Sequence, residues 1–596
     1  LDVMTDAAEM NDEVPEAYRG LDRFEARKRV VADLEAGGYL VDVEDHAHTV
    51  GRCYRCDTIV EPRLSDQWFV KMAPLAEPAL EAYRTGDLRF HPERYGKIYQ
   101  NWMENIRDWV ISRQLWWGHR IPVWYCLNEA CGEVIVSRDD PDRCPACEGQ
   151  VEQDPDVLDT WFSSWLWPFS TLGWPDDTED LRVFYPTDTL VTAPDILFFW
   201  VARMVMAGIE FQGEIPFTDV LLNGTVRDHL GRRMSKSLNN GIDPVQVVEM
   251  YGADAMRFTL IRGAPLGTDQ QLNNEDLEEA FRPGRNFANK IWNAARFALP
   301  HLPDDGDAVP ATGLADRWIR SRLARTAAEV DAAFEAFRLH EAAEACHSFV
   351  WGDFCDWYLE LVKRRLDRPG TEEHGAAGAT LRAVMEGWLG LLHPIMPFVT
   401  ETIARRIPGR GDESTLVMGP WPEISADWVD DDAESAMSAL REFVGAIRAL
   451  RAEYRVDPHQ PLEVRLAGIG PALEAALEEE LDSVLRFASL SRIHNMGDGS
   501  AAAPGEPGAN AVLRMGGEVF IPLRDVIDLD RERERIGGDA RHISGLLRST
   551  RGKLENAGFV SNAPEEVVQR ERDKLVSLAD QLKRLEEKLQ SLGAPD

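Results

Sequence analysis

A chain of 596 residues is too long to fold around one hydrophobic core, so we expect several domains. The net charge of −37 opposes nonspecific attraction to nucleic acid, although a local basic patch still acts within a Debye length of roughly 8–10 Å. No run of eighteen or more apolar residues occurs, so we expect no membrane-spanning segment. The first residues lack a basic stretch followed by an apolar one, so we expect no secretory signal and a cytoplasmic protein.

The first half of the chain predicts a mixed α/β structure. Residues 1–60 contain polar turns and one helical segment, 22–36, without a sign of their own core. Between 61 and 285, short apolar runs alternate with helical periodicities, which is typical of a parallel α/β sheet. Residues 217–226 predict a strand that ends in Asn-Gly, and Asp243 followed by Pro244 predicts the start of a helix.

The region from 286 to 455 predicts helices almost throughout. Apolar residues recur three and four positions apart in four segments: 286–299, 314–337, 339–363 and 380–406. Pro394 and Pro397 interrupt the last of them. Residues 456–525 are rich in Gly, Pro and Ala with short strand-like runs, so a small mixed module is expected there.

The tail, 526–596, predicts two long helices. Leucines at 575, 578, 582, 585, 589 and 592 step by three and four, and a matching apolar stripe covers 529–554. A helix-ending sequence at 556–558 and a capped helix start at 562–564 separate the two stripes. This pattern predicts an antiparallel coiled-coil hairpin. Its many arginines are compatible with a solvated dimerisation or spacer arm, or with an arm that lies on nucleic acid.

Cysteines are concentrated in one region, because six of the eight lie between positions 53 and 147. In a long chain without a secretory signal, paired cysteines indicate metal binding before disulfides. Two pairs separated by twelve residues predict a structural zinc ribbon over 124–150, with four thiolate ligands: Cys126, Cys131, Cys144 and Cys147. Cys53 and Cys56 form a half-site without an obvious partner pair. Cys346 and Cys355 fall on apolar helix faces and are predicted core residues.

One loop is suited to phosphate chemistry. Residues 231–244 read GRRMSKSLNNGIDP, between a predicted strand and a capped helix. Lys236, flanked by Ser235 and Ser237, offers a mobile positive charge and hydroxyl donors to a pyrophosphate leaving group. A five-residue match of this kind is usually a solvated surface turn, but its place between strand and helix favours the phosphate interpretation.

This loop resembles the KMSKS signature of class I aminoacyl-tRNA synthetases, with Arg233 in place of the first lysine. The family usually continues with Lys or Leu and then Gly-Asn-Val, where residues 238–241 of this chain are Leu-Asn-Asn-Gly. Longer segments resemble the valyl branch of that class: DWVISRQLWWGHRIPVW at 108–124, DTWFSSWLWPFSTLGWP at 159–175, TAPDILFFWVARM at 192–204 and NFANKIWNAARF at 286–297. The terminal hairpin also matches the C-terminal arm of that branch.

The resemblance implies a multidomain fold, α/β and then all-α. It comprises the tail of an editing domain (1–60), the second half of a Rossmann-like catalytic domain (61–285), a helical-bundle anticodon-binding domain (286–455), a small α/β junction (456–525) and a coiled-coil tRNA-binding arm (526–596). It also implies a ligase that joins valine to tRNA(Val) through valyl-adenylate, with ATP as substrate and Mg²⁺ on the phosphates. The family uses the loop's second lysine, here Lys236, on the ATP phosphates.

The resemblance further implies two binding sites. Four residues match positions of the valine side-chain pocket: Trp161, Asp195, Ile196 and Trp200. Apolar walls exclude larger side chains but cannot strongly reject threonine, which differs from valine by a hydroxyl group. Asn293 and Phe297, one helical turn apart, match anticodon-contacting positions, and Phe297 is almost as readily interpreted as core.

The chain starts at Leu1 rather than Met, and it contains no HIGH-type signature at a strand-to-helix turn. We therefore expect an incomplete chain that lacks the first nucleotide-binding signature and most of the editing domain. Alone, it is expected neither to activate valine nor to edit. Two alternatives stay open: a fragment of an isoleucyl- or leucyl-tRNA synthetase, and a catalytically inactive tRNA-binding protein. A monomer is expected in each case.

Overall fold

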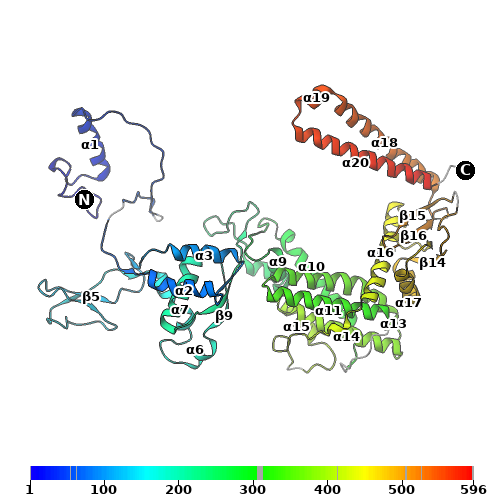
Figure 1. Ribbon diagram of the computed structural model, residues 1–596, viewed down its shortest axis with the longest axis horizontal. Coiled ribbons are helices and arrows are strands. Elements are labelled where there is room, and N and C mark those ends of the chain that lie inside the picture. The colour runs from blue at the N-terminus through cyan, green and yellow to red at the C-terminus, as the bar shows by residue number, and fades with distance from the viewer. Residues whose placement is uncertain are drawn as a thin grey trace. The chain divides into compact units, whose positions relative to one another are not determined.

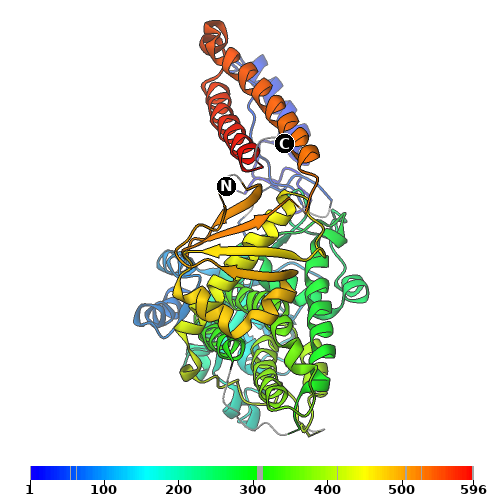
Figure 2. The ribbon, with the colours of Figure 1, turned by 90° about the vertical axis from the view of Figure 1, so that its right-hand side faces the viewer.

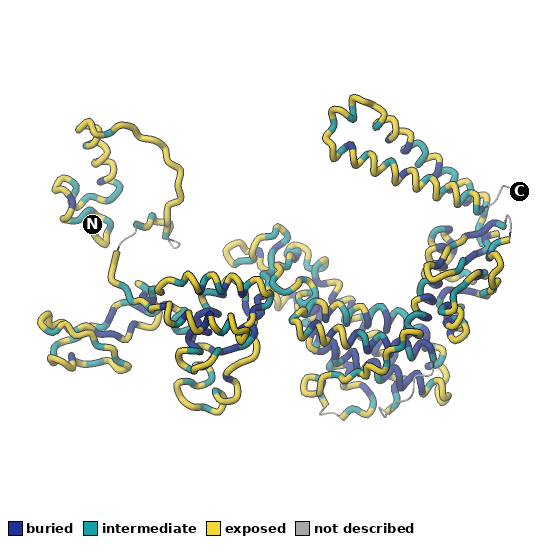
Figure 3. The backbone as a smooth tube through the Cα atoms, viewed as in Figure 1, coloured by how far each residue is buried: buried dark blue, intermediate teal, exposed yellow. Residues whose placement is uncertain are grey.

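The computed structural model describes residues 2–53, 56–61, 64–304, 313–411, 414–503, 506–524 and 526–592. The chain divides into two compact units, Leu1–Leu190 with Asp195–Val220, and Val191–Pro194 with Leu221–Asp596 (Figure 1). Buried residues are concentrated in the helical part of the second unit (Figure 3). Within the described ranges, every helix is too short or too polar to cross a membrane.

The first unit begins with a segment that is mostly exposed (Figure 3). It contains the short η1 (Glu16–Tyr18) and the helix α1 (Arg23–Ala36), which confirms the helix predicted from residue 22. The Asp22 carboxylate accepts the Phe24 N–H at 2.9 Å, so Asp22 is the N-cap of α1.

A small three-stranded sheet lies mostly in the first unit. Its strands lie in the order β2 (Arg89–His91), β10 (Phe217–Leu222) and β9 (Thr187–Thr192). The Thr187 N–H donates to the Pro216 carbonyl, and the Asn223 N–H donates to the Thr192 carbonyl, both at 3.0 Å. The residue numbers of the paired residues increase together along the two strands, so β9 and β10 are parallel, as predicted. The buried helix α7 (Ala202–Gln212) makes the crossover between them.

Smaller elements surround this sheet. The helices α2 (Ala73–Thr85) and α3 (Arg94–Glu104) pack together, and α2 also packs on α7. Two short antiparallel ladders join β1 (Phe69–Val70) to β3 (Trp109–Val110) and β4 (Ser112–Arg113) to β8 (Val157–Leu158). The remaining helices are α4 (Thr160–Ser164), α5 (Trp167–Ser170), α6 (Glu179–Phe184), η2 (Pro194–Ile196) and the π-helical η3 (Leu197–Val201).

An ion cluster ties two strands of the sheet together and makes its stability depend on pH. The Arg89 guanidinium donates to the Asp219 carboxylate at 2.6 and 2.9 Å, and His91 Nε2 lies 2.8 Å from it. Hydrogen bonding from Arg89, which outweighs burial, lowers the pKa of Asp219 to about 2. An unfolded aspartate has a pKa near 3.9, so the cluster stabilises the fold above about pH 4 and loses its effect as the pH falls toward 2.

We expect Asp219→Asn to lower the free energy of unfolding by about 1–2 kcal/mol at pH 7, a value reduced for solvent screening of the half-exposed Arg89. Near pH 3 the difference from the wild type should be roughly half as large. Thermal unfolding followed by tryptophan fluorescence at both pH values measures it. Asp188→Asn, at an exposed position of β9, is the control. A difference that is equal at both pH values would contradict the prediction.

The predicted strand 217–226 is shorter in the structure. β10 ends at Leu222, and β11 (Val226–Arg227) pairs in parallel with β12 (Gln270–Gln271) instead. Gly224 explains the interruption, because a Cβ at this position would lie 1.9 Å from the Thr268 carbonyl oxygen. Only glycine lets the two backbones approach this closely.

Helices dominate the second unit, as predicted. They are α8 (Pro244–Tyr251), α9 (Ala253–Gly263), α10 (Leu277–Ala298), η4 (Leu299–His301), α11 (Leu314–Glu335), α12 (Leu339–His347), η5 (Ser348–Tyr358), α13 (Leu359–Leu366), α14 (Glu372–Leu392), α15 (Pro397–Ala404), η6 (Ala426–Trp428) and α16 (Asp431–Glu453). The predicted segment 380–406 is divided between α14 and α15 at its two prolines. The predicted segment 339–363 is helical throughout but contains the π-helical η5, for which the periodicity gave no indication.

A four-stranded sheet follows the helices, in the order β14 (Leu490–Asn495), β13 (Leu462–Ala467), β16 (Glu518–Pro522) and β15 (Gly508–Val512) (Figure 2). β13 pairs in parallel with β14 and antiparallel with β16. The helix α17 (Pro471–Phe487) packs along β14 and against α16. Most buried residues of the sheet belong to one apolar core shared with the helices, and a second small cluster comprises Ala467, Ala501 and Phe520.

The tail forms a hairpin of two long helices, α18 (Leu529–Glu555) and α20 (Glu565–Ser591), joined by the short α19 (Ala557–Asn562). Arg533 donates to the Leu592 carbonyl at 2.7 Å, and Lys553 lies 3.3 Å from Glu571, so the helices are antiparallel. Every position of the two predicted apolar stripes is buried or half-buried. The short helix in the turn was not predicted, and residues 593–596 of the predicted tail lie outside the described residues.

Candidate functional sites

A buried carboxylate holds the start of the predicted phosphate loop. Asp228 follows β11, and its Oδ1 accepts the N–H groups of Leu230 at 3.0 Å and Arg232 at 2.8 Å. The Arg232 guanidinium donates to Oδ2 at 2.8 Å. Burial raises the pKa of Asp228, but hydrogen bonds from Asn240 and Arg232 outweigh it and hold the pKa well below its usual range. Asp228 is therefore charged at neutral pH, where it anchors the loop.

Asn240 closes the same loop from its other end. Its Nδ2 donates to Asp228 Oδ2 at 2.9 Å and to the Arg233 carbonyl at 3.2 Å. Its Oδ1 accepts the Ser235 N–H at 2.9 Å. The structure thus places the predicted ATP-handling residues on one short turn, with Lys236 exposed: Arg233, Ser235, Lys236 and Ser237.

The departure from the family signature at position 239 has a structural explanation. Asn239 has a φ of +48°, in the left-handed region, where the family usually has glycine. Asparagine is among the non-glycine residues that enter this region most readily. The Asn239 N–H donates to the Lys236 carbonyl at 3.3 Å, and the Ser235 hydroxyl lies 3.1 Å from the Ser237 hydroxyl. Asparagine therefore preserves the tight turn at the tip of the loop.

The predicted valine-pocket residues lie on α4, η2 and η3 of the first unit: Trp161, Asp195, Ile196 and Trp200. The Trp200 indole Nε1 donates to the Ser164 carbonyl on α4 at 3.1 Å. The Trp161 ring stacks on Phe199 with a centroid distance of 5.8 Å. These contacts bring α4 and η3 together, and both tryptophans remain half-buried. Ile196 is half-buried and Asp195 is exposed where η2 meets η3.

Several residues that hold α4 in place were not predicted from the sequence. Asp159 is the N-cap of α4, and its Oδ1 accepts the Trp161 N–H at 3.3 Å. Its Oδ2 accepts hydrogen bonds from Trp109 Nε1 at 3.0 Å and from Arg113 at 2.6 Å. The Arg203 guanidinium lies 3.6 Å from the Trp109 ring centroid, and burial lowers the pKa of Arg203 to about 10. Asp159, two residues before Trp161, could have been predicted as an N-cap from the sequence. Trp109, Arg113 and Arg203 come together only in the folded chain.

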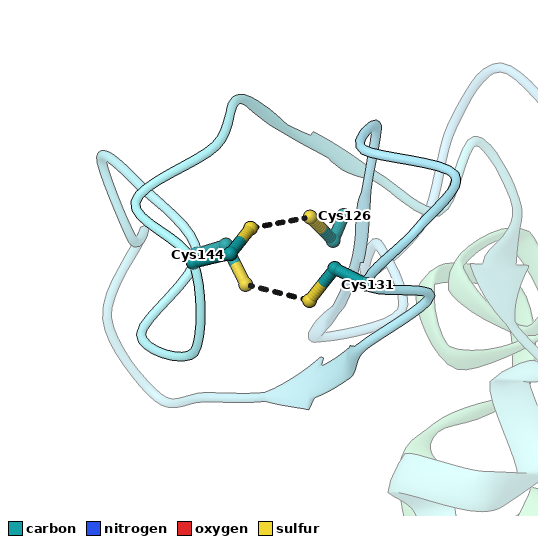
Figure 4. Close-up of side chains that lie close together, drawn as sticks. Cys126, Cys131 and Cys144 are labelled. Carbon is teal, nitrogen blue, oxygen red and sulfur yellow. Dashed lines mark hydrogen bonds between the residues drawn. The ribbon is translucent and has the colours of Figure 1, made fainter.

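The four predicted zinc ligands come together beside a small three-stranded sheet in the order β6 (Val134–Val136), β5 (Val123–Cys126) and β7 (Val151–Gln153). Cys126 ends β5, Cys131 follows it, and Cys144 and Cys147 lie between β6 and β7. All four Sγ atoms lie within 4.8 Å of one another. Cys126 and Cys147 are separated by 3.4 Å, and Cys131 and Cys144 by 3.9 Å (Figure 4). A tetrahedral zinc ion with Zn–S bonds of about 2.3 Å requires sulfur separations of about 3.8 Å, so the four thiols fit this metal.

The backbone around the cysteines also fits a metal site. Residues with positive φ, Gly132 and Glu148, directly follow the second cysteine of each pair. A Cβ at Gly149 would lie 3.1 Å from Cys147 Sγ and 3.5 Å from Cys126 Sγ, so glycine leaves room around the sulfurs. A hydrogen bond from the Gly149 N–H, followed by one from Cys126, lowers the pKa of Cys147 to about 7. The Asn128 backbone lowers the pKa of Cys126, but burial and hydrogen bonds with the other thiols outweigh it and raise that pKa to about 12. The four thiols therefore share their protons, and one of them is readily deprotonated.

The other cysteines differ from this cluster. Cys346 and Cys355 are buried, and burial raises the pKa of each thiol to about 12, which confirms their assignment to the core. The Cys56 thiol donates to the Thr58 hydroxyl at 3.2 Å. Among the side chains that the structure describes, only the four cysteines above form a group able to hold a metal ion, so Cys53 and Cys56 remain a half-site.

The predicted anticodon-contacting residues lie on α10. Asn293 is exposed, whereas Phe297 is half-buried and packs against the core of the helices. The Lys363 ammonium lies 5.7 Å from the Phe297 ring centroid, and the His301 ring lies 5.5 Å from it. Phe297 therefore contributes to the core while part of its ring stays accessible beside a positive charge.

Three families of known proteins match successive parts of the chain. The model for class I tRNA synthetases (I, L, M and V) matches residues 18–273. The model for the anticodon-binding domain of tRNA ligases matches residues 316–466, and the model for the valyl-tRNA synthetase tRNA-binding arm matches residues 528–593. Together with the loop and the sheet, these matches define the class as the class I aminoacyl-tRNA synthetases.

Curated relatives narrow this class. The valine–tRNA ligase of Carboxydothermus hydrogenoformans is 48% identical over 99% of the chain and 66% of its own length. The ligase of Thermotoga maritima is 46% identical over 99% of the chain and 66% of its own length. The ligase of Symbiobacterium thermophilum is 44% identical over 96% of the chain and 64% of its own length. The chain belongs to the valine–tRNA ligase family. It spans slightly less than two thirds of the length of these relatives.

Similar solved structures are more distant. Mycobacterium tuberculosis methionyl-tRNA synthetase in complex with methionyl-adenylate has 19% identity and a TM-score of 0.47, covering 63% of this chain and 72% of that one. A LeuRS–tRNA–LeuAMS ternary complex of Agrobacterium radiobacter K84 has 20% identity and a TM-score of 0.44, covering 67% and 53%. Both TM-scores are below 0.5.

Proposed function

We propose that this chain is part of an enzyme that ligates valine to tRNA(Val) through valyl-adenylate, converting ATP to AMP and pyrophosphate. The observation that carries the proposal is the identity of 44–48% to valine–tRNA ligases over 96–99% of the chain. The same relatives disfavour an isoleucyl or leucyl enzyme. We further propose that the enzyme acts as a monomer in the cytoplasm.

The loop supports the first chemical step of this reaction. A valine carboxylate oxygen attacks the α-phosphorus of ATP, and the bond to the bridging oxygen of the leaving pyrophosphate breaks. Negative charge accumulates on the departing phosphates, where the exposed ammonium of Lys236 can neutralise it. Arg233, Ser235 and Ser237 add charge and hydroxyl donors in the same turn. Mg²⁺ bound to the phosphates would supply further positive charge.

The residues on η2 and on the helices α4 and η3 support the proposed selectivity for valine. We propose that Trp161, Ile196 and Trp200 form apolar walls around the valine side chain, with Asp195 at the edge. Walls of this kind exclude larger side chains by contact, but they discriminate against threonine by only about 100-fold. An editing activity therefore suits an enzyme with such a pocket, and we assign residues 1–60 to the end of an editing domain.

The second unit supports binding of tRNA. We propose that the α18–α20 hairpin is a coiled-coil tRNA-binding arm that uses the exposed basic side chains of α18: Arg531, Arg541, Arg548 and Arg551. Asn293 and Phe297 on α10 would contact the anticodon, where a base can stack on the accessible part of the Phe297 ring. In the first unit, Zn²⁺ held by the four thiolates would fix the fold of 124–150.

Binding of transcribed tRNAs to this chain tests the tRNA part of the proposal. We expect tRNA(Val) to bind at least about tenfold more tightly than tRNA(Ile), because hydrogen bonds to the edges of the anticodon bases distinguish one base from another, and a tenfold preference needs only about 1.4 kcal/mol. Asn293→Ala should remove most of this preference. Phe297→Ala should weaken the binding of both tRNAs by about 5- to 150-fold, because stacking of one base is worth about 1–3 kcal/mol whichever base it is. Equal affinity for both tRNAs in a gel-shift titration of the wild type would reject the anticodon assignment.

A further inference from the structure

We propose that Asp228 and Asn240 form a clamp that fixes the phosphate loop, and that Asn240 is a positioning residue for Lys236. We use the name Asp228–Asn240 clamp for these two side chains and their hydrogen bonds. The inference rests on the proposed function of Lys236 in ATP chemistry and adds the residues that hold this lysine in place. Neither clamp residue is among those assigned a chemical role above.

The Asn240 side-chain amide makes three hydrogen bonds among the described residues, and all three hold the loop. Two bonds leave Nδ2, toward Asp228 and the Arg233 carbonyl, and Oδ1 accepts the Ser235 N–H. The bonds therefore hold the backbone at 233 and 235, immediately before Lys236. Asn240 is only 4% exposed, so water cannot easily replace these partners.

Asp228 gives the clamp its strength because its partners are charged or buried. The carboxylate is fully buried and receives Arg232 through both the backbone N–H and the guanidinium. Hydrogen bonds to an ionised acceptor are roughly twice as strong as neutral ones. Asn240 thus links the buried Asp228 carboxylate, before the loop, to the Ser235 backbone within it.

The clamp requires an amide at 240, and this requirement can be tested by two substitutions. Asn240→Asp removes the donor to Asp228 and brings a second carboxylate against a buried charge. Asn240→Ala removes all three hydrogen bonds of the amide without adding a charge. Asn101→Asp is the matched control, since it makes the same amide-to-carboxylate change at an exposed position of α3, outside the loop.

The test uses the intact chain and two measurements of loop opening, trypsin cleavage after Arg233 and Lys236 and hydrogen–deuterium exchange of peptides covering 229–241. Cleavage follows the population of the open loop when opening is fast. We expect Asn240→Asp and Asn240→Ala each to increase cleavage by about 10- to 100-fold. Asn101→Asp should stay within about threefold of the wild type.

Equal cleavage of Asn240→Asp and Asn101→Asp, or cleavage of Asn240→Ala within about threefold of the wild type, would overturn the clamp. A general loss of structure would instead increase exchange throughout the chain, which the same exchange maps report. Inorganic tripolyphosphate then separates the clamp from the proposed function. We expect it to slow cleavage after Lys236 in the wild type and to protect Asn240→Asp much less. If the clamp variants behave as expected but tripolyphosphate protects neither protein, the positioning of Lys236 for phosphate is rejected while the clamp stands.

Discussion

Lys236→Ala is expected to lower the rate of valine-dependent ATP–pyrophosphate exchange by about 100- to 1,000-fold, because one preorganised positive donor to the leaving phosphates is lost. The assay requires a complete enzyme. We suggest joining this chain to the third of the Carboxydothermus hydrogenoformans ligase that it does not match. The effect should fall on kcat and on the KM for ATP, whereas the KM for valine should change little, since the pocket residues are untouched.

Two further variants make this result specific to the loop. Lys236→Arg keeps the charge but not the compact ammonium, and should retain part of the activity. Lys574→Ala removes an exposed lysine on α20 and should leave exchange unchanged. A Lys236→Ala rate within about threefold of the parent chimera would refute the assignment of this residue to ATP. The parent chimera must be active for the comparison, and its inactivity would count against the proposed ligase function.

The second large effect concerns the cysteine cluster. The purified chain is expected to contain one zinc ion, and Cys144→Ser is expected to lose it, because Cys144 is the most buried of the four ligands. Binding of a structural zinc ion is worth about 10–16 kcal/mol in zinc-finger peptides, and much of it appears as local folding free energy. Without the metal, the amides of β5, β6 and β7 should therefore exchange much faster.

Elemental analysis and hydrogen–deuterium exchange measure the two parts of this prediction. Cys56→Ser is the matched control, because this exposed thiol lies outside the four-cysteine group. It should leave both the zinc content and the exchange of the three strands unchanged. Equal zinc content in Cys144→Ser and the wild type, or a wild type without zinc after expression with the metal, would reject the site.

Local sequence patterns predicted the parts of the fold that depend on near neighbours. Apolar residues three and four positions apart predicted the helices of the second unit, because one helix face must be buried whatever the partner is. Asp243 marked a helix start, since a cap bonds to N–H groups two or three residues away. The two cysteine pairs and the loop around Lys236 were likewise visible, because each is a short motif with its own spacing.

Interactions between distant residues could not be predicted in this way. The carboxylate of Asp159 meets Trp109 and Arg113 across about fifty positions of sequence, and the Arg203 guanidinium reaches the same tryptophan ring. No periodicity or spacing connects these residues. The π-helices η3 and η5 were also missed, because their composition is that of an ordinary apolar helix and their hydrogen bonding is set by packing.

The phosphate loop shows most clearly the difference between what local sequence patterns predict and what depends on the folded chain. Residue types and spacing alone assign Arg233, Ser235, Lys236 and Ser237 to one signature and identify the departure at position 239. The reason this departure is tolerated, and the contacts that hold the loop, are visible only in the folded chain. The reason is physical: Asp228 and Asn240 gain their strength from burial, and burial is a property of the folded chain.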